Sequence, residues 1–237
     1  MSSVLITGAN RGIGLALVKE FLKQGDRVIA TARQPDKADE LNALSKTYHE
    51  PNYTVIPMDV TNADSVNQAY SKIAQSFSSL DILINNAGVN PDSKDEKFED
   101  MDIAHFEMAF DVNVVGVARV SRSLLPLLRK GNEPRIINIS SGAGSIAIKT
   151  NFKLYSYSTS KAALNMFSRA LAAELKPEEI IVVALSPGWV RTDMGGDDAE
   201  ISPEESANCI VNTAHRLTMD NSSQFFGRDG NQDDYNW

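Results

Sequence analysis

The chain has 237 residues and a mass of 25.9 kDa, a length at which an α/β fold commonly forms one unit. It carries 23 Lys and Arg against 31 Asp and Glu, so its formal net charge is −8 and its pI is near 4.9. Binding to a nucleic-acid backbone or to an anionic membrane needs clustered cations. The acidic balance therefore predicts no nucleic-acid partner and no membrane partner, and the 42% hydrophobic content excludes a disordered or fibrous chain.

The cysteine content and the first residues bear on the compartment. Cys209 is the single cysteine, and we expect it to be a buried thiol in a reducing compartment. Residues 1–7 lead into an apolar segment without a basic region or a small-residue cleavage site, and no apolar run reaches the length of a membrane span. These observations predict a cytoplasmic location.

Short apolar runs alternate with segments of helical spacing along most of the chain. The runs predict strands at residues 4–7, 27–31, 54–59, 81–85, 135–140 and 180–186. The other segments predict helices at residues 13–24, 35–48, 65–77, 101–130 and 155–175, with an irregular stretch at 187–202. Nearly continuous apolar strands separated by helices indicate a parallel sheet covered on both faces. We predict an α/β fold with a doubly wound, Rossmann-type parallel sheet, in a single domain over residues 1–237, with a ligand at the strands' carboxyl edge.

A glycine-rich loop follows the first predicted strand and opens the first predicted helix. Residues 7–14 read T-G-A-N-R-G-I-G, with the spacing G-x-x-x-G-x-G. Glycines let the backbone turn sharply and approach a pyrophosphate, whose charge the helix N-terminus stabilises. A tight turn alone also favours glycine, so the position between strand and helix carries the argument. The loop predicts a dinucleotide site that includes Gly8, Asn10, Arg11, Gly12, Ile13 and Gly14.

The end of the second predicted strand distinguishes NADP from NAD. An NAD site places an acidic residue there for the ribose 2′-hydroxyl. Here the strand ends Thr31-Ala32-Arg33, and the next acidic residue is Asp36. We expect Arg33, together with Arg11, to bind a 2′-phosphate, although both could simply be solvated surface arginines. The predicted cofactor is NADP, with NADPH preferred over NADH.

Six further motifs follow the glycine loop in chain order. They are Asp59-Val60, Asn85-Asn86-Ala87-Gly88, Asn113 within a helix, Asn138-Ile139-Ser140-Ser141, Tyr157-Ser158-Thr159-Ser160-Lys161, and Pro187-Gly188-Trp189-Val190-Arg191-Thr192. With the glycine loop they cover residues 4 to about 196, and together they resemble the short-chain dehydrogenase/reductase family. The T-A-R strand end, the residues that continue from Thr192, and the tail that ends in Trp237 are similar to the carbonyl reductases of the sniffer and C-factor type.

The resemblance implies roles for cofactor-binding residues. Asp59 and Val60 would contact adenine, and Asn86, Ala87 and Gly88 would line the adenosine side. The cofactor segment after the sixth strand would comprise Pro187, Gly188, Val190 and Thr192. Thr192 would anchor the nicotinamide carboxamide, although an ordinary helix N-cap remains an open interpretation for this residue.

The resemblance also implies a catalytic set of Asn113, Ser141, Tyr157 and Lys161. Lys161 would hydrogen-bond the nicotinamide ribose, and Asn113 would support a water that relays protons to Lys161. An amide that bonds backbone carbonyls at a kink within the helix is compatible with that role for Asn113.

The residues themselves support proton transfer at one helical face. Reduction of a carbonyl needs a proton at the oxygen, and the ordinary tyrosine pKa near 10 is too high for easy exchange at neutral pH. Residues four apart on a helix share a face, so Tyr157 and Lys161 can act together, and we expect the ammonium to lower the tyrosine pKa. A solvated Tyr/Lys pair is the alternative.

A serine on the fifth predicted strand completes the candidate catalytic set. We assign Ser141 to orient the carbonyl oxygen and expect Ser140 to face the opposite way, because side chains alternate along a strand. Sixteen positions separate Ser141 from Tyr157, a few more than is usual in the family, and the extra residues fall in the range 144–154.

Other polar and apolar side chains receive weaker assignments. His49, His105 and His215 show no metal-ligand spacing, so we predict no metal site and solvated or capping histidines. The acidic residues that surround the start of the helix at 101–130 are expected to be solvated; they are Asp92, Asp95, Glu96, Glu99, Asp100 and Asp102. Possible substrate-pocket residues, with core packing as the alternative, are Ile148, Phe152, Trp189 and Met194.

These observations favour an NADPH-dependent reductase of a small-molecule aldehyde or ketone, which could also run as an alcohol dehydrogenase. An NAD-dependent hydroxysteroid- or polyol-type dehydrogenase is the alternative enzyme, opposed by Arg33. A non-catalytic NADP-binding sensor is the alternative from another class, opposed by the retained Tyr157 and Lys161. A homodimer or homotetramer is possible through the helices at 101–130 and 155–175.

Overall fold

The computed structural model describes residues 1–93, 97–151, 153–231 and 237. Its strands form one parallel sheet with the order β3-β2-β1-β4-β5-β6-β7. The strands are β1 (Ser3–Ile6), β2 (Arg27–Ala32), β3 (Tyr53–Pro57), β4 (Ile82–Asn85), β5 (Arg135–Ile139), β6 (Ile181–Ser186) and β7 (Phe225–Gly227). The strand order reverses between β1 and β4, so a ligand site is expected there, at the carboxyl edge. The predicted doubly wound α/β fold is confirmed.

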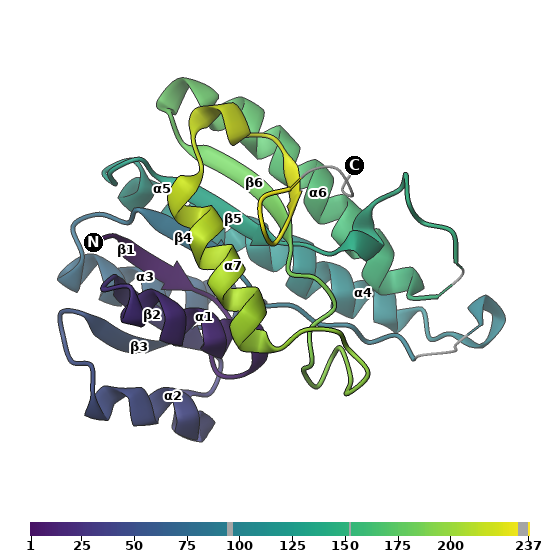
Figure 1. Cartoon of the computed structure of the whole chain (residues 1–237), viewed down its shortest axis with the longest axis horizontal. Coiled ribbons are helices and arrows are strands. Elements are labelled where there is room, and N and C mark those ends of the chain that lie inside the picture. Colours follow the sequence, from purple (N-terminus) through teal and green to yellow (C-terminus); the bar gives the residue numbers. More distant parts are fainter. Residues whose placement is uncertain (94–96, 152, 232–236) are drawn as a thin grey trace.

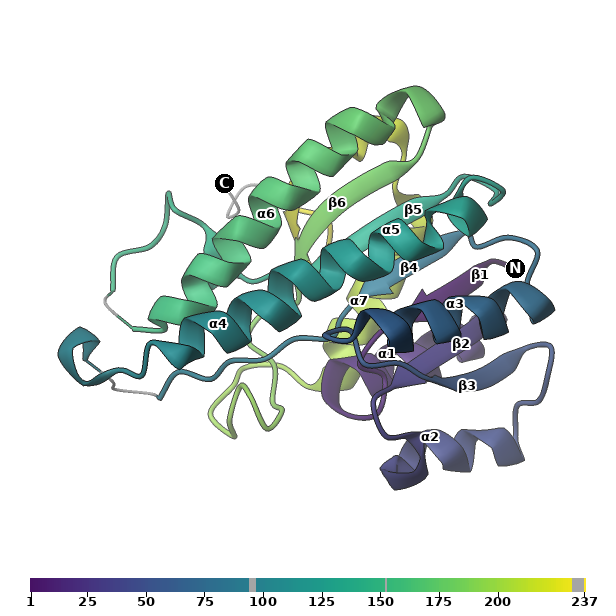
Figure 2. The same cartoon turned by 180° about the vertical axis from the view of Figure 1, so that it is seen from behind.

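Helices cover both faces of the sheet. They are α1 (Gly12–Lys23), α2 (Asp39–Ala43), α3 (Ala63–Ser76), α4 (Ala104–Phe110), α5 (Val117–Leu128), α6 (Tyr155–Leu175) and α7 (Pro203–Arg216). Figure 1 shows α1 and α7 in front of the sheet and α2 beyond its β3 edge, and Figure 2 shows α3, α5 and α6 on the opposite face. None of the helices within the described residues is both long enough and apolar enough to cross a membrane.

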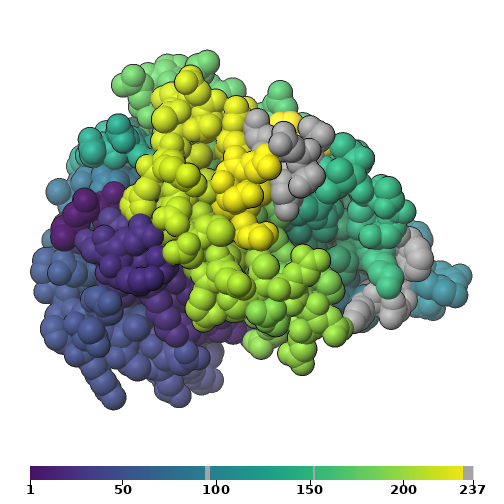
Figure 3. Space-filling view, viewed as in Figure 1, coloured from purple at the N-terminus to yellow at the C-terminus, as the bar shows by residue number. Residues whose placement is uncertain are grey.

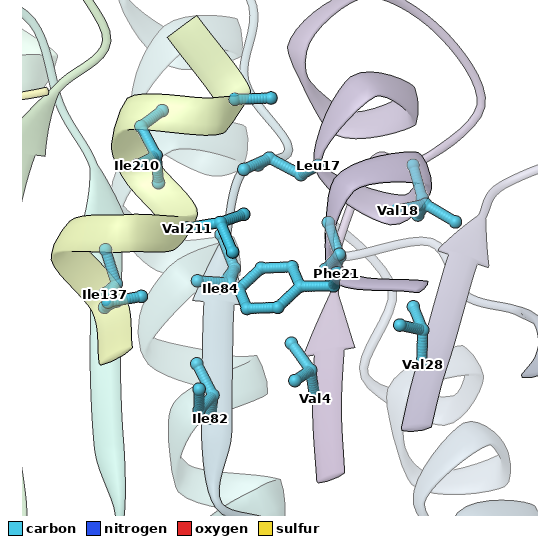
Figure 4. Packing of buried hydrophobic residues seen from close by; sticks show 14 of the residues in the cluster. Val4, Leu17, Val18, Phe21, Val28, Ile82, Ile84, Ile137, Ile210 and Val211 are labelled. Carbon is cyan, nitrogen blue, oxygen red and sulfur yellow. The ribbon is translucent and has the colours of Figure 1, made fainter. Parts of the chain in front are cut away.

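Each layer of helices encloses its own apolar core. On one side, Phe21 of α1 is fully buried and points toward Ile84 of β4 and Val211 of α7 (Figure 4). On the other side, Leu83 of β4 packs in a cluster with Leu124 of α5. Burial of one such side chain contributes about 1.5–3 kcal/mol, so the two cores hold the sheet rigid under the site at its edge.

The C-terminal part of the chain differs from the sequence prediction. Six strands were expected, but α7 and β7 follow the irregular stretch and extend the sheet by one strand. Ser202 caps α7 by accepting from Glu205 N, and the Glu205 carboxylate accepts from Ser202 N. This capping box, with Pro203 at the first helical position, is a sequence signal that could have located α7.

Two predicted helices are interrupted. The helix expected at 35–48 consists of two 3₁₀ turns that flank the short α2. The helix expected at 101–130 begins at Ala104 and contains a π-helical segment, Asp111–Gly116, between α4 and α5. Such segments widen a helix by one residue and often occur at functional sites. Asn113 lies in this segment.

Candidate active site

A cavity of about 1120 Å³ opens along the carboxyl edge of the sheet, lined by segments that follow β1 to β6. It exceeds the size of a typical small-molecule pocket, which leaves room for a dinucleotide and a second small molecule. All of the predicted site residues line this cavity except Asn113, which is buried behind its lining. The lining residues among them are Gly8, Asn10, Arg11, Gly12, Ile13, Gly14, Arg33, Asp59, Val60, Asn86, Ala87, Gly88, Ser141, Tyr157, Lys161, Pro187, Gly188, Val190 and Thr192.

The glycine loop packs closely against the segment after β4. Gly8 has φ +63°, and a Cβ there would lie 2.8 Å from Ala87 Cα. A Cβ on Gly14 would lie 2.3 Å from Gly8 O. The Asn86 side-chain amide donates to the carbonyls of Thr7 and Gly8 at 2.9 and 3.1 Å. Only glycine fits these contacts, so the loop is held in one shape at the mouth of the cavity.

The N-terminus of α1 fits a phosphate group. Among the described residues no side chain caps this helix, and its first turn holds no acidic residue. The unpaired backbone N–H groups and the helix dipole therefore face the cavity at Gly12, Ile13 and Gly14. An anion bound there would receive these donors, as the pyrophosphate of a dinucleotide does.

Basic side chains lie at the end of the cavity that follows β2. Arg33 is exposed there, and Lys37, which the sequence analysis did not single out, lines the same cavity. Lys19 also lines it but pairs with Glu40 at 3.2 Å. Arg11 pairs with Asp193 at 2.5 Å, so its guanidinium is engaged within the protein. The cations at this wall suit an anionic group beyond the pyrophosphate.

Tyr157, Lys161 and Ser141 come together on one wall. Ser141 lies close enough to Tyr157 for its hydroxyl to stabilise a phenolate there, and Lys161 Nζ lies 5.7 Å from the Tyr157 ring centroid. Lys161 Nζ donates to the carbonyl of Ile139 at the end of β5, at 2.8 Å. The Ser140 hydroxyl, in contrast, donates to Asn165 at 2.5 Å, and this residue is only 2% exposed.

The electrostatics of this wall differ from the sequence expectation. Burial raises the pKa of Tyr157, and the neighbouring Ser141 hydroxyl offsets only part of that rise. Burial also lowers the pKa of Lys161 to about 8. The expected lowering of the tyrosine pKa by the ammonium is therefore wrong for the protein alone. The phenol keeps its proton at neutral pH, which suits a proton donor.

Asn113 joins the segment after β4 to α6, from behind the cavity wall. Its amide nitrogen donates to the carbonyl of Val89 and to the Ser160 hydroxyl, each at 2.9 Å. Its amide oxygen accepts from Val89 N, also at 2.9 Å. A Cβ on Gly88 would lie 3.3 Å from this oxygen and 3.6 Å from Lys161 Nζ. The side chain thus fixes the segment after β4 close to Lys161.

Asp59 and Val60, which follow β3, form another part of the cavity wall. One carboxylate oxygen of Asp59 accepts from the backbone N–H and the hydroxyl of Thr61. The carbonyl of Val60 accepts from Arg119, and a Cβ on Gly116 would lie 3.0 Å from the Val60 side chain. Close packing against the π-helical segment therefore sets the position of this apolar side chain.

The segment after β6 closes the cavity from the other side. Gly188 has φ +83°, and the carbonyl of Pro187 accepts from Ser206 of α7 at 2.7 Å. The Thr192 hydroxyl accepts from Gly195 N at 3.1 Å, so it caps a turn and not a helix. In Figure 3 these yellow-green residues lie against the purple N-terminal residues, where a Cβ on Gly12 would lie 3.2 Å from Thr192.

The structure agrees with some of the weaker assignments and contradicts others. Trp189 and Met194 line the cavity, whereas Ile148 does not, and Phe152 lies outside the described residues. Cys209 is partly exposed, so its assignment as a buried thiol is wrong. Within the described part of the chain, no three His, Cys, Asp or Glu side chains gather as metal ligands.

Asp92 departs most from the sequence analysis, which expected a solvated carboxylate. Its side chain is only 2% exposed, and it accepts hydrogen bonds from Ser156 Oγ and from the backbone N–H of Tyr157. Asp95 and Glu96 of the same predicted group lie outside the described residues. Nothing in the local sequence around Asp92 indicates a contact with a helix that begins 63 positions later.

Comparisons with known proteins agree with this geometry. A family model for short chain dehydrogenases matches residues 2–201. The carbonyl reductase Sniffer of Drosophila melanogaster superimposes with a TM-score of 0.91 at 34% identity over 97% of this chain and 98% of that chain. An NADPH-bound carbonyl reductase from chicken fatty liver superimposes with a TM-score of 0.89 at 33% identity over 97% of each chain.

A bacterial relative extends the likeness. The C-signal protein of Myxococcus xanthus is 39% identical over 153 residues, which are 65% of this chain and 91% of that protein. The similarity to sniffer-type reductases and to a C-factor protein, expected from the motifs, is confirmed. The matched family model covers every motif from the glycine loop to Thr192, and the chain belongs to the short-chain dehydrogenase family.

Proposed function

We propose that this protein transfers a hydride between NADP(H) and a carbonyl or alcohol substrate, acting as an NADPH-dependent reductase of aldehydes or ketones. The observation that carries the proposal is that Tyr157, Ser141 and Lys161 line the same cavity as the glycine loop, with the Lys161 ammonium beside the Tyr157 ring. A proton donor and a dinucleotide-shaped wall in one cavity are what carbonyl reduction requires.

The residues divide the work of the reaction. NADPH, when bound, supplies the hydride to the carbonyl carbon. Tyr157 gives its phenolic proton to the carbonyl oxygen as negative charge develops there, and Ser141 donates a hydrogen bond to the same oxygen. Lys161 lies near enough to stabilise the phenolate that remains. Asn113 holds the segment after β4 in place beside Lys161.

The preference for NADP is part of the proposal. Arg33 and Lys37 line the adenosine end of the cavity and would bind a 2′-phosphate, and Arg11 can join them if it leaves Asp193. The similar chicken reductase is an NADPH complex. Asp59 and Val60 would contact adenine, whereas Gly188, Val190 and Thr192 would face the nicotinamide half.

We also propose the extent of the functional unit, the cellular location and the surface used for self-association. We place the whole activity in one unit over residues 1–237, because the single sheet carries both the dinucleotide wall and Tyr157. We also propose a cytoplasmic location, which the single cysteine favours because a reducing compartment needs no disulfides. Self-association would use the helices that carry exposed Met108 and Met166.

A panel of aldehydes and ketones tests the activity. Purified protein should consume NADPH with members of the panel, and Tyr157→Phe should abolish turnover while NADPH binding stays intact. Tyr155→Phe is the matched control, because Tyr155 lies on the same turn but does not line the cavity. Tight NADPH binding without turnover would instead favour a sensor, and turnover with NADH alone would favour an NAD-dependent dehydrogenase.

A further inference from the structure

The catalytic helix α6 begins without a local cap. Its N-cap residue, Leu154, has an apolar side chain and a left-handed backbone with φ +61°. Helices leave their first N–H groups unpaired, and a side-chain oxygen at the N-cap normally accepts from the third helical N–H. In α6 that third residue is Tyr157. The backbone of the candidate proton donor therefore needs an acceptor from another part of the chain.

Asp92 supplies that acceptor from the segment after β4. Its Oδ2 accepts from Tyr157 N at 2.9 Å, and its Oδ1 accepts from Ser156 Oγ at 2.6 Å. We propose that Asp92 is a positioning residue that caps α6 in place of Leu154 and thereby fixes the Tyr157 phenol in the cavity. The proposal goes beyond the reductase function, and only its kinetic test rests on that function.

Lys149 offsets part of the cost of burying this carboxylate, and His105 lies beside it. His105 Nδ1 of α4 lies 3.9 Å from Asp92 Oδ1. Lys149, from the stretch between Ser141 and Tyr157 that is longer than usual, is attracted to Asp92. Partial burial lowers the pKa of Lys149, and the charge of Asp92 opposes that shift. An unpaired buried carboxylate would be expensive, so the two hydrogen bonds and the attraction to Lys149 explain how it persists beside the site.

Lys149 also ties its own segment to α6. Its ammonium donates to the carbonyl of Lys153 at 2.7 Å and to Ser158 Oγ at 2.9 Å. The first turn of α6 is therefore held from two sides, by Asp92 and by Lys149. Asn113 holds the next turn through Ser160. A phenol on such a turn keeps one position, and a displacement of about 1 Å at a reacting group can cost about a hundredfold in rate.

Substitution of Asp92 tests the cap through kinetics. Asp92→Ala should lower kcat by about tenfold or more, with the NADPH dissociation constant within about twofold of wild type, because the glycine loop is untouched. Asp92→Asn keeps one acceptor of the same shape and should recover part of the lost kcat. Asp102→Ala is the matched control, because Asp102 lies just before α4 and accepts from the backbone N–H of Ala104, the first helical residue, at 2.9 Å. It should leave kcat unchanged.

Amide hydrogen exchange tests the same contact without turnover. Asp92→Ala should speed exchange at Ser156 and Tyr157, and Asp102→Ala should speed exchange only at the start of α4. If the wild-type protein reduces no carbonyl, the proposed function fails while the exchange result still decides the cap. If Asp92→Ala does not fold, Asp92→Asn carries both measurements, with faster exchange at Tyr157 and lowered kcat expected.

Several results would overturn the proposal. One is wild-type exchange at Tyr157 in Asp92→Ala. A second is a kcat within about twofold of wild type in that variant. A third is a fall in kcat matched by an equal loss of NADPH affinity, which would indicate collapse of the cofactor site. The last is an Asp92→Asn variant with no more activity than Asp92→Ala.

Discussion

Arg11 and Asp193 join the two sides of the cavity mouth, with Arg11 Nη1 2.5 Å from Asp193 Oδ2. The pair links the glycine loop to the segment after β6, next to the contact of Gly12 with Thr192. Both side chains are more than 70% exposed, so the pair contributes at most about 1 kcal/mol. A bound 2′-phosphate can therefore compete with Asp193 for the Arg11 guanidinium.

Removal of Asp193 should strengthen NADPH binding. Asp193→Ala frees Arg11, and loss of a competing interaction of up to about 1 kcal/mol should tighten NADPH binding by up to about fivefold. NADH lacks the phosphate, so its affinity should stay the same. Titration of both cofactors at low salt measures the effect. Asp197→Ala removes the same charge from the same segment, and an equal change in that variant would contradict a specific pairing.

Arg33 should control cofactor selectivity. Arg33→Asp replaces a cation at the adenosine end with an anion, and loss of a charge-assisted bond should raise the Michaelis constant for NADPH by about tenfold or more. The constant for NADH should change far less. Lys46→Asp makes the same charge change outside the cavity lining and serves as the control. Equal effects on both cofactors would refute the assignment of Arg33.

Substitutions at two glycines with positive φ should distinguish the cost of backbone strain from the cost of lost close packing. Gly8 and Gly25 have φ +63° and +86°, but only a Cβ on Gly8 meets a neighbour, Ala87 Cα at 2.8 Å. Gly25→Ala should cost about 1–2 kcal/mol of stability and leave NADPH affinity unchanged. Gly8→Ala should cost more and weaken NADPH binding by about tenfold or more. Chemical denaturation and cofactor titration measure both, and equal behaviour of the two variants would contradict the packing argument.

The sheet was largely predictable because its strands are buried on both faces. The six predicted strands differ from β1 to β6 by one or two residues at their ends, since a continuous apolar run is needed wherever helices cover both sides. β7 has three residues, Phe225–Gly227, too few for any period to be visible.

The candidate site was predictable where its residues are neighbours along the chain. Glycine spacing and the four-residue step from Tyr157 to Lys161 are local, and the structure brings these residues to one cavity. The cap from Asp92 and the pairing of Arg11 with Asp193 are contacts over 65 and 182 positions. No local pattern encodes such contacts, because they depend on which loops the finished sheet places side by side. The raised pKa of Tyr157 likewise follows from burial of its side chain, and this burial cannot be predicted from the four-residue step between Tyr157 and Lys161.

The buried ammonium of Lys161 should make stability depend on pH. Burial lowers its pKa from 10.5 to about 8, so between about pH 8 and 10 the folded protein has released a proton that the unfolded chain still holds. The free energy of unfolding therefore rises by up to about 1.4 kcal/mol per pH unit in this window. Below about pH 8 both states hold the proton, so Lys161 adds no further pH dependence there. Lys161→Met removes the contribution, whereas Tyr157 and Lys149 titrate in both proteins. Urea unfolding without added NADP(H) should show the wild-type minus variant difference rising from pH 8 to 10, and a flat difference would show that Lys161 is not desolvated.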